Sequence, residues 1–210
     1  MKKIKLTMIM IINILIINHH ESNSTNLEEM EIKNMELKSP ITIYMAGKVA
    51  KGEEIGKIKD WRQYYVEKLS PLGNFKFVSP ENPDTDETKP FEVFGYACHL
   101  IKESDMVLVD ASQKLGVGTS QEMLVAKHFN KRVATILPPN TPHRRTNLQM
   151  YEREVKDWIH PFIYSTSDHI FSNSEEVKEF FSNISEHLKI APKNISVIDS
   201  AIESYLKLTK

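Results

Sequence analysis

A glycine-rich segment that ends at Glu122 carries the side chains best suited to chemistry. Gly116 and Gly118 are spaced so that the backbone can come close to a bound ligand. Thr119 or Ser120 is a good helix N-cap, and the free N–H groups behind such a cap suit an anion or a sugar oxygen. Glu122 would then lie in the first helical turn, with its carboxylate facing the ligand. A glutamate near a helix start is also favoured by the helix dipole, so both explanations stand.

The chain around this segment alternates short apolar runs with helical stretches. We expect strands at residues 41–46, 75–78, 106–109 and 133–137, and helices at 57–69, 91–103 and 119–129. This alternation is typical of a doubly wound parallel sheet, in which strands are continuously apolar because both faces are covered.

Beyond Pro139 the pattern is less regular. We expect a polar loop at 144–150 and a short helix at 151–158. A fifth strand is expected in the region bracketed by 162–164 and 169–171. The C-terminal part predicts a helix over 174–188, capped by Ser174, and a last helix over 194–206.

Ligands of open parallel sheets bind outside the carboxyl ends of the strands. Tyr44, Gly47 and Lys48 follow the first predicted strand, and residues 79–82, 110–112 and 138–141 follow the next three. We therefore expect a ligand site at this edge, with Gly47, Lys48 and the glycine-rich segment as binding residues.

Three stretches together are similar to a known family. They are IYMAG at 43–47, SDMVLVD at 104–110, and LGVGTSQEM at 115–123 with Ala126 on the same helix. As a set they resemble the nucleoside 2-deoxyribosyltransferase superfamily, which includes 2′-deoxynucleoside 5′-phosphate N-hydrolases. The resemblance implies a flavodoxin-like α/β fold with a five-stranded parallel sheet and helices on both faces. It also implies a (deoxy)nucleoside or its 5′-monophosphate as substrate.

The resemblance implies three catalytic residues. Glu122 would be the nucleophile that attacks the anomeric carbon and displaces the base, because the transition state is oxocarbenium-like. The Tyr44 hydroxyl would hold Glu122 or the sugar, although its ring could equally be a core residue. Asp110 would meet the base or sugar, or could instead cap its loop. Transfer and hydrolysis stay open, since they differ only in whether a base or water takes the sugar.

One family feature is missing. Family members often carry an Asp about two turns before the third strand, whereas residues 96–99, around Ala97, contain no carboxylate. Glu92, Asp84 or Asp86 could take its place. A non-catalytic nucleotide-binding module of the same fold is therefore the alternative to a transferase or glycosidase.

Composition limits the classes of molecule that the chain is expected to bind. The net charge is −1 without a basic block, which argues against a nucleic-acid binder. The single cysteine, Cys98, excludes an intramolecular disulfide, and the histidines are not spaced as metal ligands. We expect a small-molecule substrate and neither metal nor organic cofactor; the resemblance adds a homo-oligomer.

Residues 1–38 are expected to lie outside the domain, which would span 39–210. Lysines at 2, 3 and 5 precede an apolar run over 6–17 that is too short for a membrane span and is similar to a signal peptide without a cleavage site. It could instead be an interfacial anchor, or sequence upstream of a start at Met35. We expect a cytoplasmic protein, or an exported one if the segment is a true signal; a membrane is a partner only if the segment is an anchor.

Overall fold

A computed structural model describes residues 39–49, 60–81, 84 and 86–208. The chain divides into two units, Met1–Pro40 and Ile41–Lys210, and the fold below is that of the second. The expectations for residues 1–38, and for a helix start at 57, lie outside the described residues. None of the described helices is both long and apolar enough to cross a bilayer.

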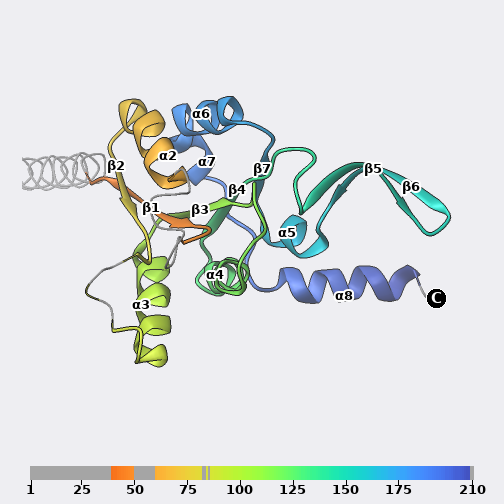
Figure 1. The fold of residues 1–210 in the computed structure, drawn as a ribbon, viewed down its shortest axis with the longest axis horizontal. Coiled ribbons are helices and arrows are strands. Elements are labelled where there is room, and N and C mark those ends of the chain that lie inside the picture. The colour runs from red at the N-terminus through yellow and green to blue at the C-terminus, as the bar shows by residue number, and fades with distance from the viewer. Residues whose placement is uncertain (1–38, 50–59, 82–83, 85, 209–210) are drawn as a thin grey trace, which may run out of the picture. The chain divides into compact units, whose positions relative to one another are not determined.

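The second unit is built on a five-stranded parallel sheet (Figure 1). Its strands are β1 (Ile41–Ala46), β2 (Phe75–Val78), β3 (Met106–Asp110), β4 (Arg132–Ile136) and β7 (His169–Phe171). Their order is β2-β1-β3-β4-β7, and every neighbouring pair is parallel. This is the flavodoxin-like order, so the predicted fold class is confirmed.

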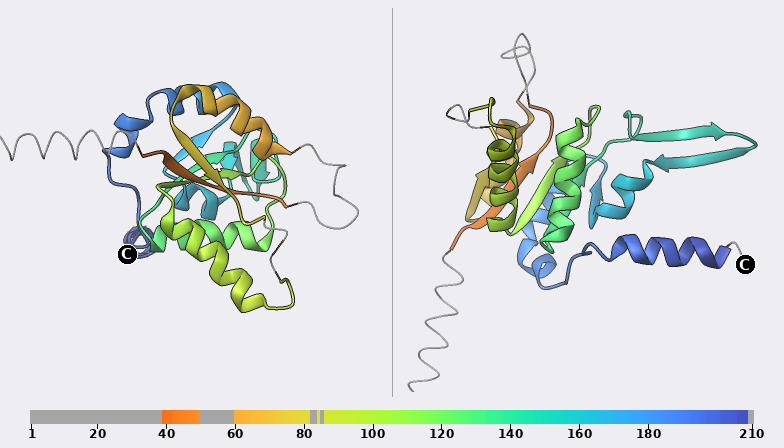
Figure 2. Two further views of the ribbon diagram at one scale, coloured as in Figure 1. Left: turned by 90° about the vertical axis from the view of Figure 1, so that its left-hand side faces the viewer. Right: turned by 90° about the horizontal axis from the view of Figure 1, so that it is seen from below.

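Helices cover both faces of the sheet. α2 (Trp61–Leu69), α6 (Ser174–Ser182) and α7 (Ile184–Leu188) lie on one face, and α3 (Pro90–Glu103), α4 (Val117–His128) and α5 (Pro161–Thr166) on the other (Figure 1). A 3-10 turn (Ser70–Leu72) extends α2, and α8 (Val197–Leu208) ends the described chain. α3 and α4 lie side by side (Figure 2).

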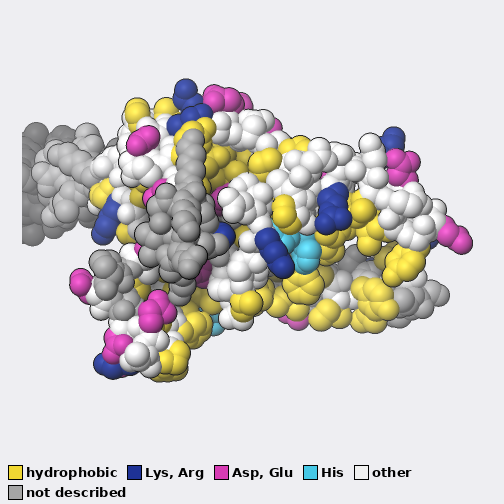
Figure 3. Space-filling view, viewed as in Figure 1, with side chains coloured by type: hydrophobic (Ala, Val, Ile, Leu, Met, Phe, Trp, Pro, Cys, Tyr) yellow, Lys and Arg dark blue, Asp and Glu magenta, His cyan; other side chains and the backbone are white. Residues whose placement is uncertain are grey.

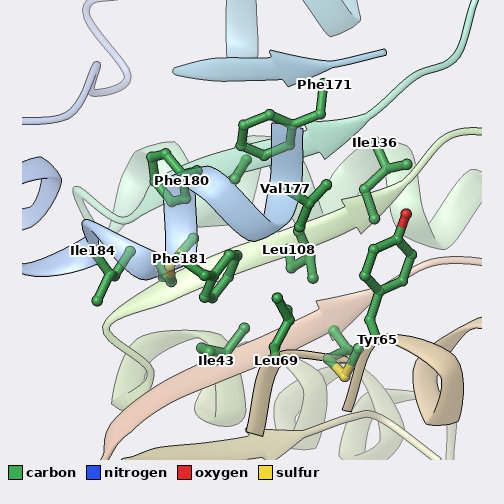
Figure 4. Packing of buried hydrophobic residues seen from close by; sticks show 13 residues of the cluster. Ile43, Tyr65, Leu69, Leu108, Ile136, Phe171, Val177, Phe180, Phe181 and Ile184 are labelled. Atoms are coloured by element: carbon green, nitrogen blue, oxygen red, sulfur yellow. The ribbon is translucent and has the colours of Figure 1, made fainter. Parts of the chain in front are cut away.

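Successive side chains of a strand point to opposite faces of the sheet, so the core is divided into two parts, one on each face. Ile43 and Met45 of β1 pack toward α2 and α6, where they meet Leu69 and Phe181 (Figure 4). Tyr44 and Ala46 of β1 pack toward α3 and α4. β3 and β4 are buried along their whole length, which explains their continuous apolar sequence.

The region from 144 to 159 was predicted wrongly as a loop and a helix. It forms an antiparallel hairpin of β5 (Arg144–Met150) and β6 (Arg153–Ile159). Most of its side chains are exposed, so no apolar periodicity marks either strand. The connecting pair Tyr151-Glu152 also lacks the Gly or Asn usual in such turns, although Tyr151 has a φ of 55°.

Four helix boundaries also differ from expectation. α4 begins at Val117 behind an N-cap at Gly116, so Glu122 lies in the second turn and not the first. Residues 162–164 belong to α5, which Pro161 starts, and only β7 supplies the fifth strand. The helix predicted over 174–188 is capped by Asn173 and interrupted between α6 and α7. The last helix begins at Val197 rather than 194.

Candidate active site

The candidate site lies at the carboxyl edge of β2, β1 and β3. Tyr44 of β1 pairs with Val78 of β2 and with Val107 of β3. Because parallel strands advance together, the positions three residues further on reach the edge at one level. These positions are Gly47, Glu81 and Asp110.

A hydrogen bond joins the two residues expected at the centre of the site. The Tyr44 hydroxyl donates to Oε1 of Glu122 at 2.8 Å, across 78 positions of sequence. The Tyr44 side chain is fully buried, because its ring packs in the core between the sheet, α3 and α4. Both interpretations of this tyrosine therefore hold: the ring is a core residue, and the hydroxyl reaches the candidate nucleophile.

Burial and two neighbours set the charge state of this pair. Burial raises the pKa of Glu122, while the Tyr44 hydrogen bond and the positive charge of Arg62 lower it again. The pKa of Tyr44 is raised strongly, first by burial and then by the charge of Glu122. Tyr44 thus stays a protonated donor, and Glu122 is a more basic carboxylate than one in water, as a nucleophile or general base requires.

Asp110 reaches the same edge but is not bonded to this pair. Its side chain is buried, and Oδ1 accepts a hydrogen bond from the backbone N–H of Ser112 at 3.0 Å. Burial, and next the charge of Asp110, raise the pKa of Tyr65 on α2. No hydrogen bond connects Asp110 to Tyr44 or Glu122, and all three are described. Asp110 caps its own loop, and a role toward the base or sugar stays a prediction.

The glycine-rich segment leaves open space before α4. A Cβ added at Gly116 or Gly118 would meet nothing within 4 Å, so the protein itself does not require glycine there. Neither Thr119 nor Ser120 is the N-cap: Thr119 is buried, and the Ser120 hydroxyl donates back to the Gly116 carbonyl at 3.2 Å. Since the first turn of α4 holds no acidic residue, capping does not explain Glu122.

The predicted binding residues after β1 are held by α2. A Cβ at Gly47 would lie 2.6 Å from Cζ2 of Trp61, so close packing against this ring requires the glycine. The Lys48 carbonyl accepts a hydrogen bond from Arg62 at 3.0 Å. A substrate role for Gly47 and Lys48 stays a prediction.

Sequence reasoning missed Arg62, which is buried at this edge. Its guanidinium donates to three backbone carbonyls at the end of β1 or just beyond it, and to the Glu81 carboxylate. No local signal distinguishes this arginine, because an Arg in a helix is usually a surface residue.

Cys98 of α3 lies in the stretch, residues 96–99, where the resemblance predicts an aspartate. Burial raises the pKa of its thiol, and the charge of Glu122 raises it further, so the thiol stays neutral. Two of the alternative carboxylates are engaged elsewhere, since both Asp86 and Glu92 pair with Lys89.

The hairpin supports the site from one side. Nε2 of His143 accepts a hydrogen bond from the backbone N–H of Leu115 at 2.9 Å and so ties the glycine-rich segment to the start of β5. Arg144 directs its donors to protein groups, among them both carboxylate oxygens of Asp157 at 2.9 and 2.8 Å. This arginine is therefore a structural residue of the hairpin.

The surface offers no metal cluster in the described part of the chain: no group of three or more His, Cys, Asp or Glu side chains is arranged to hold an ion there. On the face shown in Figure 3, the visible Lys and Arg side chains are scattered and do not form a stripe.

No protein-family model and no curated protein sequence matches the chain. Among solved structures, a 2-deoxyribosyltransferase from Leishmania mexicana matches with 16% identity and a TM-score of 0.47, over 69% of this chain and 98% of that one. A 2-deoxyribosyltransferase from Bacillus psychrosaccharolyticus matches with 17% identity and a TM-score of 0.45, over 65% and 90%. The Clostridium botulinum CMP N-glycosidase BcmB matches with 15% identity and a TM-score of 0.37, over 66% and 96%. The matching structures thus include members of the family that the motifs resemble, and at these identities the likeness assigns no activity to this chain.

Proposed function

We propose that this chain cleaves or transfers the N-glycosidic bond of a (deoxy)nucleoside or its 5′-monophosphate, with Glu122 as the nucleophile. The observation that carries the proposal is the 2.8 Å hydrogen bond from Tyr44 to Glu122 beside the carboxyl edge of the parallel sheet. A half-buried carboxylate with a raised pKa, held by a neutral donor, has the chemistry of a nucleophile for an anomeric carbon.

In the first step, an Oε atom of Glu122 attacks the anomeric carbon, and a glycosyl ester forms. The bond from that carbon to the base nitrogen breaks, and its electron pair stays on the base, which takes up a proton. In the second step, water or a second base attacks the same carbon and frees Glu122. The Tyr44 hydroxyl keeps the carboxylate in one orientation through both steps.

The proposal assigns the activity to residues 39–210 and includes a homo-oligomer. α8 supports self-association, because it has no buried residue and exposes Ile198, Ile202 and Tyr205 on one side. Light scattering of the purified chain tests this part of the proposal, and a monomer at all concentrations would reject it.

The test is base release from deoxynucleosides and their 5′-monophosphates, with and without an acceptor base. Wild type is compared with Glu122→Ala and with a matched control, Glu154→Ala, which removes an exposed carboxylate of β6. We expect release by wild type and the control, and none by Glu122→Ala. Dependence on the acceptor base separates transfer from hydrolysis, and release by Glu122→Ala at the wild-type rate would reject Glu122 as nucleophile.

A non-catalytic nucleotide-binding module is the second candidate. The observation that favours it is the thiol of Cys98 in the place where the resemblance predicts a carboxylate. Calorimetric titration with the same nucleotides distinguishes the two. Saturable binding without base release would select the binding module.

A further inference from the structure

Arg62 makes four side-chain hydrogen bonds at the edge of the sheet. Nε donates to the Met45 carbonyl at 3.3 Å, and Nη2 donates to the Gly47 carbonyl at 3.1 Å. Nη1 donates both to the Lys48 carbonyl and to Oε1 of Glu81, each at 3.0 Å. Four of the five N–H groups of the guanidinium are thus used on the chain itself.

These hydrogen bonds hold the chain at the carboxyl ends of the neighbouring strands β1 and β2. Three of the acceptors lie at the end of β1 or just beyond it, and Glu81 lies three residues beyond β2. The helix that carries Arg62 is fixed in turn, because the Asp60 side chain accepts from the backbone N–H of Arg62 at 2.9 Å. Removing this guanidinium would therefore leave the main chain after β1 without its anchor.

Arg62 also supplies a buried positive charge that acts on Glu122. Its side chain is only 8% exposed, whereas that of its ion-pair partner Glu81 is 41% exposed. A buried cation is screened less by water than an exposed one, so its field extends further through the protein. In accordance with this, the charge of Arg62 lowers the pKa of both Glu122 and Tyr44.

We propose that Arg62 is the positioning residue of the site: it fixes the main chain at the end of β1, next in sequence to the tyrosine that holds Glu122, and supplies a buried positive charge that acts on that carboxylate. It acts through Glu122 and through residues 45–48, and it takes no part in the bond changes. The inference rests on the proposed function, because Glu122 is the group that Arg62 serves.

Arg62 combines a positive charge with a planar group that can serve several acceptors, and two substitutions test these properties separately. Arg62→Lys keeps the charge but loses the planar fork that serves several acceptors together. Arg62→Gln keeps a polar side chain but loses the charge. Besides burial, the groups that act on Glu122 are the Tyr44 hydroxyl of β1, through its hydrogen bond, and the charge of Arg62 of α2, and only the second is changed.

The first readout needs no enzymatic activity. The Glu122 carboxyl is titrated by NMR in the full chain labelled with carboxyl-¹³C glutamate, and its signal is identified by its loss in Glu122→Gln. We expect Arg62→Gln to raise the pKa of Glu122 by about one unit, and Arg62→Lys to leave it within a few tenths of a unit. A loss of structure alone would not separate the two variants in this way.

The second readout is steady-state base release. We expect Arg62→Lys to raise KM by about tenfold with a smaller change in kcat, because the carbonyls of Met45, Gly47 and Lys48 are no longer held together. Thermal unfolding and circular dichroism establish that each variant is folded, and if Arg62→Gln does not fold, the KM of Arg62→Lys decides.

The outcomes separate this inference from the proposed function. If wild type releases base but Glu122 titrates alike in wild type and folded Arg62→Gln, the inference fails and the function stands. An unchanged KM in Arg62→Lys overturns the positioning role as well. If wild type releases no base but the pKa of Glu122 follows the charge at position 62, the proposed activity is rejected, and of the inference only the effect of the Arg62 charge on Glu122 stands.

Discussion

Replacing Tyr44 by Phe removes one oxygen from the site and leaves the ring in the core. The lost group is the hydroxyl that donates to Oε1 of Glu122 at 2.8 Å. This hydrogen bond lowers the pKa of Glu122, against the burial that raises it. Without the bond, the carboxylate is less stable relative to its protonated form, so the pKa of Glu122 rises further.

The magnitude follows from the strength of a hydrogen bond to a charged group. Such a bond contributes about 1.5–3 kcal/mol, and one pKa unit corresponds to about 1.4 kcal/mol. The pKa of Glu122 should therefore rise by about 1–2 units. A nucleophile must be ionised, so the acid limb of the pH profile of kcat/KM should move to higher pH by the same amount.

The assay is base release across the pH range in wild type, Tyr44→Phe and a matched control. Tyr65→Phe is the control, because Tyr65 is also a buried tyrosine of the core but its pKa responds to Asp110 and not to Glu122. We expect the control to keep the acid limb of wild type. If Tyr44→Phe lowers the maximum of kcat/KM but leaves the acid limb in place, the Tyr44 hydroxyl does not set the pKa of Glu122.

Further predictions concern the surroundings of the site and the stability of the fold. Cys98→Asp should move the acid limb to higher pH by about one unit or more, because a like charge disfavours ionisation of the nucleophile; Cys98→Ser should leave it in place in the same assay. Gly47→Ala should displace the ring of Trp61, 2.6 Å from the new Cβ, and lower base release. Gly95→Ala, in the open middle of α3, should instead stabilise the fold by about 0.5–1 kcal/mol in urea denaturation. Lys127→Met should cost about 3 kcal/mol in the same denaturation experiment, because it breaks a buried ion pair with Asp168; a loss below about 1 kcal/mol would contradict the importance of this pair.

Much of the fold could be read from local patterns. β1 and β2 have the predicted bounds, and β3 and β4 lie within one residue of them. These strands could be predicted because helices cover both faces of the sheet, and strands buried on both faces consist of nearly continuous apolar residues. The hairpin of β5 and β6 was missed, because its strands stabilise each other by pairing while their side chains stay exposed.

For the candidate site too, the sequence predicted some features and not others. The sequence by itself predicted that Tyr44, Gly47 and Glu122 lie at one edge of the sheet, because strand ends and a glycine-rich turn are local features. Only the tertiary structure decided what these residues touch. Register and helix packing between distant segments bring Tyr44 to Glu122 and the carbonyls of Met45 and Gly47 to Arg62. They also bring the Cys98 thiol within the electrostatic influence of Glu122. Such contacts leave no local pattern, since an arginine or cysteine in a helix has the same sequence signature whether it faces water or a carboxylate.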